Sequence, residues 1–98
     1  MKKQVKIHNE VTLVGRIRHT GTIVKLDNKD ALRVIISVPN DENYKSEPNN
    51  ISVYFKTSDY KIFRNKKNKA IAISGHIDTK RGQKIICDVM SFIKEPAN

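Results

Sequence analysis

The sequence is short of several residue types, and each shortage narrows what the chain can be. It has a single cysteine among 98 residues, so no disulfide can form within the chain. Cys87 lies in an apolar run, where its expected role is that of a small buried hydrophobic residue. No apolar run has the pattern of a signal peptide or the length of a membrane span. We therefore expect a cytoplasmic protein.

Catalytic signatures are also missing. The sequence contains no P-loop, no glycine-rich nucleotide fingerprint and no serine nucleophile motif. The histidines His8, His19 and His76 have no metal-ligand spacing to one another or to Cys87. Most acidic residues fall in expected loops, which disfavours a two-metal carboxylate site. We expect neither enzymatic activity nor a metal or cofactor.

Acidic residues are few beside basic ones. The chain has 19 Lys and Arg against 10 Asp and Glu, a net charge of +9. This balance favours a polyanionic partner, and nucleic acid is the commonest one. A membrane surface would call for a basic amphipathic helix, which the sequence lacks. The length fits one domain, expected over residues 9–94 after an arm at 1–8 and before a short tail at 95–98.

Alternation of apolar and polar residues predicts five β-strands separated by turn formers. The expected strands are 10–18, 31–38, 51–56, 70–77 and 85–93. Gly21 marks a bulge or bend at 19–22, after which the chain runs on to a turn at 27–30. This spacing indicates a long bent strand, a hairpin and its partner strand.

A change of periodicity over residues 57–66 predicts a short helix with Ser58 as its N-cap. Residues 39–50 contain two prolines and are expected to form a loop. Five strands with one helix between the third and fourth match the oligonucleotide-binding (OB) fold, a five-stranded Greek-key barrel. The expected class is all-β with small α content.

The order of these motifs resembles that of bacterial-type single-stranded DNA-binding proteins, over roughly residues 9–93. The family barrel begins N-x-V-x-L-x-G-R/N-L, and residues 9–17 read NEVTLVGRI. Its fourth strand reads V-x-V-x-G-x-L before a glycine-containing hairpin and a valine-rich strand, and residues 72–77 and 82–92 are similar. The resemblance implies sequence-tolerant binding of single-stranded DNA by a protein that forms homo-oligomers.

The chain departs from the family in its aromatic residues. The resemblance implies bases that stack on tryptophan and phenylalanine, yet the sequence has no tryptophan. By strand parity Phe55 belongs to the core, whereas Tyr54 lies on the outer face and is the expected stacking residue. Tyr44, in the preceding loop, is a second candidate. Members of the family also end in a flexible linker and an acidic tip that recruits other proteins. This sequence shows neither feature, so we expect any protein partner to bind the barrel or its loops.

A surface for single strands needs cations along the phosphate backbone and flat side chains for the bases. On the outer parity of the strands, the candidate cations are Arg16, Arg18, Arg33 and Lys56. Around the last hairpin, the candidates are Lys80, Arg81 and Lys84. The alternative for this face is an ordinary solvated surface, with Tyr54 packed on its neighbours. For the hairpin cations, solvation is favoured over binding.

Two functions fit this pattern. The first is a single-stranded DNA-binding protein of replication or repair, belonging to a mobile element. The second is an accessory subunit that docks on a polymerase, primase or helicase and supplies a nucleic-acid-holding surface. An obligate heteromer would expose apolar residues, and the candidates on the polar parity are Val14, Ile35 and Ile86. Specific RNA recognition is a third alternative, disfavoured because cold-shock aromatic motifs are absent.

Overall fold

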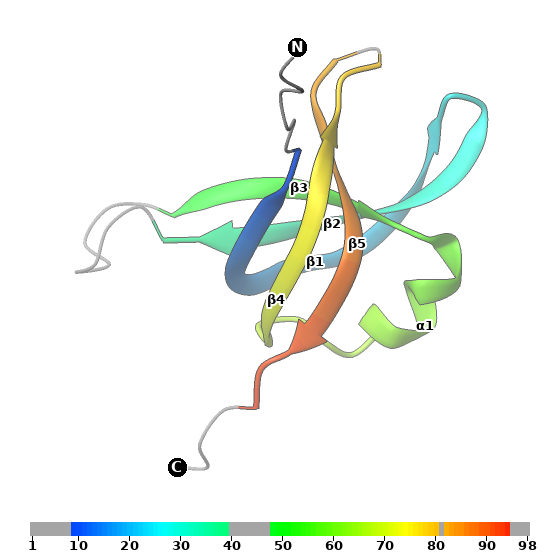
Figure 1. Cartoon of the computed structure of the whole chain (residues 1–98). Helices are drawn as coiled ribbons and strands as arrows, with labels where there is room; N and C mark the ends of the chain where they lie inside the picture. Colours follow the sequence, from blue (N-terminus) through cyan, green and yellow to red (C-terminus); the bar gives the residue numbers. More distant parts are fainter. Residues whose placement is uncertain (1–8, 40–47, 81, 95–98) are drawn as a thin grey trace, which may run out of the picture.

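The computed structural model describes residues 9–39, 48–80 and 82–94, and the expected arm at 1–8 and tail at 95–98 lie outside them. Five strands close into one barrel in the order β1-β2-β3-β5-β4 (Figure 1). The strands are β1 (Val11–Leu26), β2 (Lys29–Val38), β3 (Asn49–Phe55), β4 (Ala70–Asp78) and β5 (Lys84–Phe92). In the described part of the chain, β3 and β5 pair in parallel, and the other neighbours are antiparallel. The predicted OB barrel is confirmed.

The first strand is one long, bulged element, as the sequence predicts. β1 has 16 residues, and its register with β2 shifts between Ile17 and His19 and again between His19 and Thr22. Gly21 has a φ of +123°, and a Cβ at this position would lie 2.6 Å from Leu32 Cδ1. A side chain would therefore be strained and would clash. The bulges bend β1 so that its first part pairs with β4 and its second part with β2.

The third strand begins earlier than the sequence indicates. The sequence pattern places Asn49 and Asn50 in the loop, but in the structure they pair with Val38 and Ser37 and extend the β2–β3 ladder. Asparagine has low strand propensity, yet pairing with an existing neighbour overrides it. At its other end β3 stops at Phe55 rather than Lys56, because the chain turns into η1 (Thr57–Asp59).

The core is formed by the predicted inward parity together with one helical residue. Its buried members are Ile17, Leu32, Val34, Ile36, Val53, Phe55, Phe63, Ile71 and Ile73. Phe63 comes from α1 (Tyr60–Phe63), and its ring centroid lies 4.7 Å from that of Phe55 and 5.8 Å from that of Phe92. In Figure 1, α1 lies at the end of the barrel away from the β4–β5 hairpin. Phe63 thus packs into that end of the core.

The expected helix is present, but the prediction of its N-cap is wrong. Ser58 lies inside the 3-10 turn η1, which Lys56 precedes in an extended conformation. Neither η1 nor α1 has a side-chain cap hydrogen bond. The turn begins directly after β3, so Ser58 already follows the first helical residue and cannot take the extended capping conformation.

The start of the barrel is held by the side chain of Asn9. Its Nδ2 donates a hydrogen bond to the Ile77 carbonyl at 2.7 Å, and its Oδ1 accepts one from the Ile77 amide at 2.8 Å. The amide group therefore satisfies both main-chain groups of a strand residue, as a neighbouring strand would. This pairing gives a structural role to the asparagine that opens the NEVTLVGRI motif.

Cys87 packs half-buried against the core, and burial, together with Asp59 and Asp88, raises the pKa of its thiol to about 11. The raised pKa means that the folded state favours the protonated thiol. The protonated Cys87 thiol therefore contributes fully to stability below pH 9, which is the ordinary pKa of a cysteine thiol, and this contribution is lost as pH rises through about 11.

We expect Cys87→Ala to remove this part of the alkaline loss of stability. Urea unfolding of the parent and the variant at pH 8, 9, 10 and 11 measures it as the difference between the two free-energy curves. Lysine and tyrosine ionisation affects both proteins and cancels in that difference. If the free energy of unfolding falls equally with pH in both proteins, the raised pKa of Cys87 is contradicted.

Candidate nucleic-acid interface

The outer surface of β2 and β3 places a cation beside a flat ring. Arg33 lies opposite Tyr54 of β3 and opposite Thr22 of β1, and both Arg33 and Tyr54 alternate with buried residues of their strands. Side chains paired in this way have Cβ atoms about 4.5–5.5 Å apart. Arg33 Nε donates a hydrogen bond to Ser52 Oγ at 3.0 Å, which holds the guanidinium on this surface. We call Arg33, Ser52 and Tyr54 the β2–β3 face.

Two hollows flank the β2–β3 face. The bulge pocket has a volume of about 330 Å³ and is lined by His19, Thr20, Gly21, Thr22, Arg33 and Ile35. It lies where the register shifts of β1 leave irregular backbone beside β2. The seam pocket has a volume of about 360 Å³ and is lined by Asn50, Ile51, Ser52, Tyr54, Ile77, Gln83, Lys84 and Ile85. Arg33 borders one pocket and Tyr54 the other.

Other predicted site residues extend this surface. Lys56 is exposed and extended directly after β3, so it lies on the same side as Tyr54, two residues along the chain. Lys84 lines the seam pocket, with its Nζ 3.4 Å from the Lys80 carbonyl oxygen. Lys80 is exposed in the hairpin, and its amide donates to Asp78 Oδ1 at 2.9 Å. Tyr44 and Arg81 lie outside the described residues.

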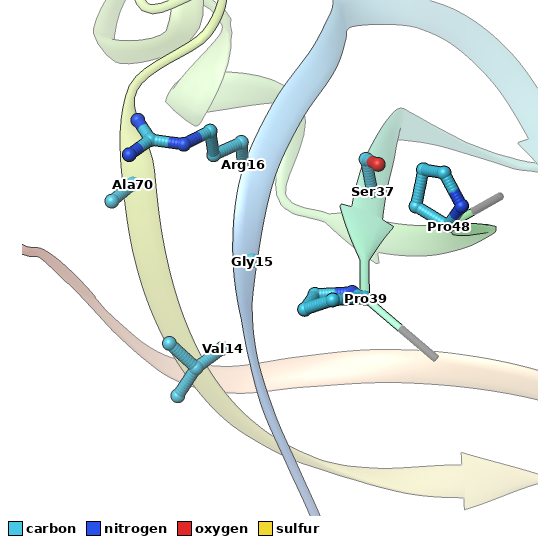
Figure 2. Close-up of a pocket in the computed structure, with 7 residues that line it drawn as sticks. All are labelled: Val14, Gly15, Arg16, Ser37, Pro39, Pro48 and Ala70. Carbon is cyan, nitrogen blue, oxygen red and sulfur yellow. The ribbon is translucent and has the colours of Figure 1, made fainter. Parts of the chain in front are cut away.

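Arg16 lies apart from this group. It is opposite Ser37, roughly 13 Å along β2 from Arg33 at the usual rise of a strand. Arg16 Nη1 donates to the Asn68 carbonyl at 3.0 Å. Figure 2 shows its side chain turned toward Ala70 of β4 and away from Ser37. The guanidinium therefore points away from the β2–β3 face.

Arg18 is the extra residue of the first bulge. It lies between the Ile17–Ile36 and His19–Ile35 pairs and is exposed. The strict alternation used to place Arg16 and Arg18 on one face with Arg33 therefore breaks at this position. Arg18 remains at the solvent surface near the bulge pocket, whereas the side chain of Arg16, two residues earlier, turns toward β4 (Figure 2).

A third hollow, of about 440 Å³, lies beside Arg16. It is lined by Val14, Gly15, Arg16, Ser37, Pro39, Pro48 and Ala70 (Figure 2). Arg16 is its one charged lining residue among those the structure describes, and the guanidinium is already bonded to the Asn68 carbonyl. This hollow is therefore less suited to a polyanion than the two pockets beside Arg33.

The outer surface of β1, β4 and β5 has a different character. Register places Thr12, Ser74 and Val89 in one row and Val14, Ala72 and Ser91 in the next. Val14 is 53% exposed and Val89 is 66% exposed. We call these two rows the uncharged face. Of the apolar residues predicted on the polar parity, Val14 is exposed, whereas Ile35 and Ile86 are half-buried.

Several pocket residues were not predicted from the sequence. Asn50 continues the alternation of Ser52 and Tyr54, so extending the third strand by two residues would have found it. Ile77 shares the parity of core isoleucines but is 37% exposed at the seam pocket. His19 reaches the bulge pocket only because the register shifts. No local pattern reports such a shift.

The described residues contain no group of three or more His, Cys, Asp and Glu side chains placed to hold a metal ion. His76 Nδ1 and Asp88 Oδ2, 2.9 Å apart, form an isolated pair on β4 and β5. No helix in the described ranges is long and apolar enough to span a membrane.

Comparison with known proteins places this geometry on a known fold. No protein-family profile and no curated protein matches the sequence. Solved structures match nearly the whole chain. The dimeric N-terminal domain of PriB from Thermoanaerobacter tencongensis shares 15% identity at a TM-score of 0.70, over 89% of this chain and 98% of that one.

Two further matches are named as single-stranded DNA-binding proteins. Mitochondrial Rim1 from S. cerevisiae shares 12% identity at a TM-score of 0.71, over 94% of this chain and 100% of that one. The small protein from Streptomyces coelicolor shares 12% identity at a TM-score of 0.63, over 90% and 96%. The chain thus has the OB fold of bacterial-type single-stranded DNA-binding proteins, in agreement with the resemblance of its sequence motifs.

Proposed function

We propose that the chain binds single-stranded DNA across the β2–β3 face. The observation that carries this proposal is Arg33, held by Ser52 and adjacent to Tyr54, between two open pockets. Phosphates require cations and bases require flat side chains, and this face supplies both next to one another. The net charge of +9 attracts the polyanion at longer range. The fold shared with named single-stranded DNA-binding proteins supports the same function.

The bulge pocket suits a phosphate of the bound strand. Its lining residues include Thr20 and Thr22, which carry hydroxyl groups, and Arg33, which carries a guanidinium. Because the Nε of Arg33 is bonded to Ser52, the group is held in one plane while its terminal nitrogens provide four further N–H donors. Hydrogen bonds from such a cation to phosphate are charge-assisted and strong.

Fluorescence anisotropy with a labelled oligo-dT of about 30 nucleotides, across a salt series, tests the proposal. We expect micromolar or tighter binding that prefers the single strand to a duplex of equal length and weakens as salt rises. Indistinguishable affinities for single strand and duplex, or binding weaker than micromolar, would contradict it.

Arg33→Ala should reduce the salt dependence of binding. Loss of one phosphate contact lowers the slope of log K against log salt by about 0.7 for a single strand. Arg64→Ala is the matched control, because Arg64 is an exposed arginine at the end of α1 and its loss changes net charge equally. Equal salt slopes for the two variants would show that Arg33 does not contact a phosphate of the bound strand.

We place this binding in DNA replication or repair, since these processes expose single strands. A mobile element is the proposed source, because the third strand departs from the family pattern: it has Asn49 and Asn50 where the family places the first aromatic residue of the strand.

The uncharged face supports a second role as an interface with another protein, either a second copy or a replication enzyme. Charged residues make up 30% of the chain but are absent from the two rows that contain Val14 and Val89. Depletion of charge is typical of the centre of protein interfaces. Two copies that each carry +9 would also meet most readily where neither presents a cation.

Light scattering of the purified protein distinguishes these partners. We expect an oligomer that Val89→Asp converts to a monomer with an intact barrel, because the new carboxylate would be desolvated at the contact. Val89→Thr, which keeps the shape without a charge, should leave the assembly intact. A monomeric parent would exclude the homo-oligomer and favour the accessory-subunit role. An oligomer unaffected by Val89→Asp would move the contact elsewhere.

A further inference from the structure

The seam pocket has the composition of a site for a nucleobase. We infer that it receives one base of the bound strand and that its amide side chains make binding depend on base identity. This inference rests on the proposed function and adds to it, because a face made of cations and aromatic rings alone would be tolerant of sequence.

The pocket exists because the barrel closes weakly between β3 and β5. The two strands pair only through Val53–Ile85 and Tyr54–Ile86 among the described residues. Before these pairs the strands separate, and their starting residues line opposite sides of one hollow (Asn50, Ile51 and Ser52 from β3, and Gln83, Lys84 and Ile85 at the start of β5). The hollow is therefore open in the region where a continued ladder would have closed the sheet.

The lining combines apolar and polar side chains. Ile51, Ile77 and Ile85 contribute apolar surface, and Tyr54 stands where the two strands meet. Ile77 is 37% exposed, so part of this apolar surface is open to a ligand. A base that packs against these isoleucines would bury the apolar faces of its ring, which leaves its polar edge for the amide side chains.

The polar lining residues can hydrogen-bond with the edge of a base. Asn50 of β3 and Gln83, directly before β5, each carry a carbonyl acceptor and an NH₂ donor. Lys84 is the one charged group of this pocket in the described chain, and its Nζ lies 3.4 Å from the Lys80 carbonyl. The bulge pocket also has one Lys or Arg in its lining, but there Arg33 lies with two threonines, whereas the seam pocket sets its lysine among two amides, a tyrosine and three isoleucines. The chemistry of the seam pocket therefore fits a base better than a phosphate.

Base identity should matter because each base presents a different array of donors and acceptors. An edge that matches the two amides forms hydrogen bonds, whereas a mismatched edge leaves a polar group without a partner in a partly enclosed site. One hydrogen bond gained or lost corresponds to about 2–12-fold in affinity.

The experiment compares 15-nucleotide dT, dC and dA oligomers by anisotropy at one salt concentration. We expect the affinities of the parent to span at least about fivefold and those of Asn50→Ala/Gln83→Ala to converge within about twofold. The salt slope of the double variant should equal that of the parent, because no cation is removed. Asn65→Ala, at an exposed asparagine in the turn after α1, should keep the parent's span.

Equal affinities in the parent, or a span that survives in the double variant, would overturn the base pocket while leaving single-stranded DNA binding intact. No binding of any oligomer would overturn the proposed function as well. If the double variant does not fold, side-chain amide NMR signals of the parent decide. Asn50 and Gln83 should shift on addition of the tightest-binding oligomer more than Asn65 does, and equal small shifts would refute the pocket.

Discussion

Phe63→Ala is expected to lower the free energy of unfolding by about 3–5 kcal/mol. Phe63 is fully buried, and its ring contacts the rings of Phe55 and Phe92 across the end of the barrel. It is the buried residue of α1, so its loss would leave a cavity and also detach the helix from the core. Domains of this size have a total stability of about 5–15 kcal/mol, so a large share of it would be lost. Urea unfolding followed by circular dichroism measures this change.

Tyr60→Ala is the matched control for Phe63→Ala. Tyr60 belongs to the same helix but is 47% exposed, so its removal should change stability by no more than about 0.5 kcal/mol. A comparable loss in both variants would show that α1 stabilises the barrel through helix formation rather than through the buried ring.

Tyr54→Ala is expected to weaken binding of oligo-dT by about 1–3 kcal/mol, which corresponds to roughly 5–150-fold in Kd. Tyr54 lies beside Arg33 and at the rim of the seam pocket, where a base can stack on its ring. The salt slope should stay close to that of the parent, because the change removes no cation. Anisotropy at several salt concentrations measures both quantities.

Two further variants separate stacking from other roles of Tyr54. Tyr54→Phe keeps the ring and should bind nearly as well as the parent. Tyr60→Ala removes an exposed tyrosine of α1, away from the β2–β3 face, and should leave affinity unchanged. If Tyr54→Ala binds like the parent, Tyr54 is a surface residue that packs on its neighbours, which is the alternative that the sequence left open.

The strand inventory could be predicted from the sequence because alternation is a local property. A strand with one buried face must place apolar residues at every second position, so Leu32, Val34 and Ile36 indicate both a strand and its inner face. The same parity correctly places Phe55 inside the barrel and Tyr54 and Arg33 on its outer side. Turn formers and Gly21 mark the hairpin and the bulge for the same local reason.

The relations between strands were decided by the tertiary structure. Arg16 and Arg33 share an outer parity, yet Arg16 pairs with Ser37, four residues along β2 from Arg33. The hydrogen bond from Arg16 to the Asn68 carbonyl turns its side chain farther away. Ile77 has the parity of a core residue but lies at the open seam, because β3 and β5 meet through only two pairs in the part of the chain that the structure describes. Parallel pairing between residues distant in sequence leaves no local period. The sequence by itself therefore determined which residues face outward, and the closure of the barrel decided which of them meet in one site.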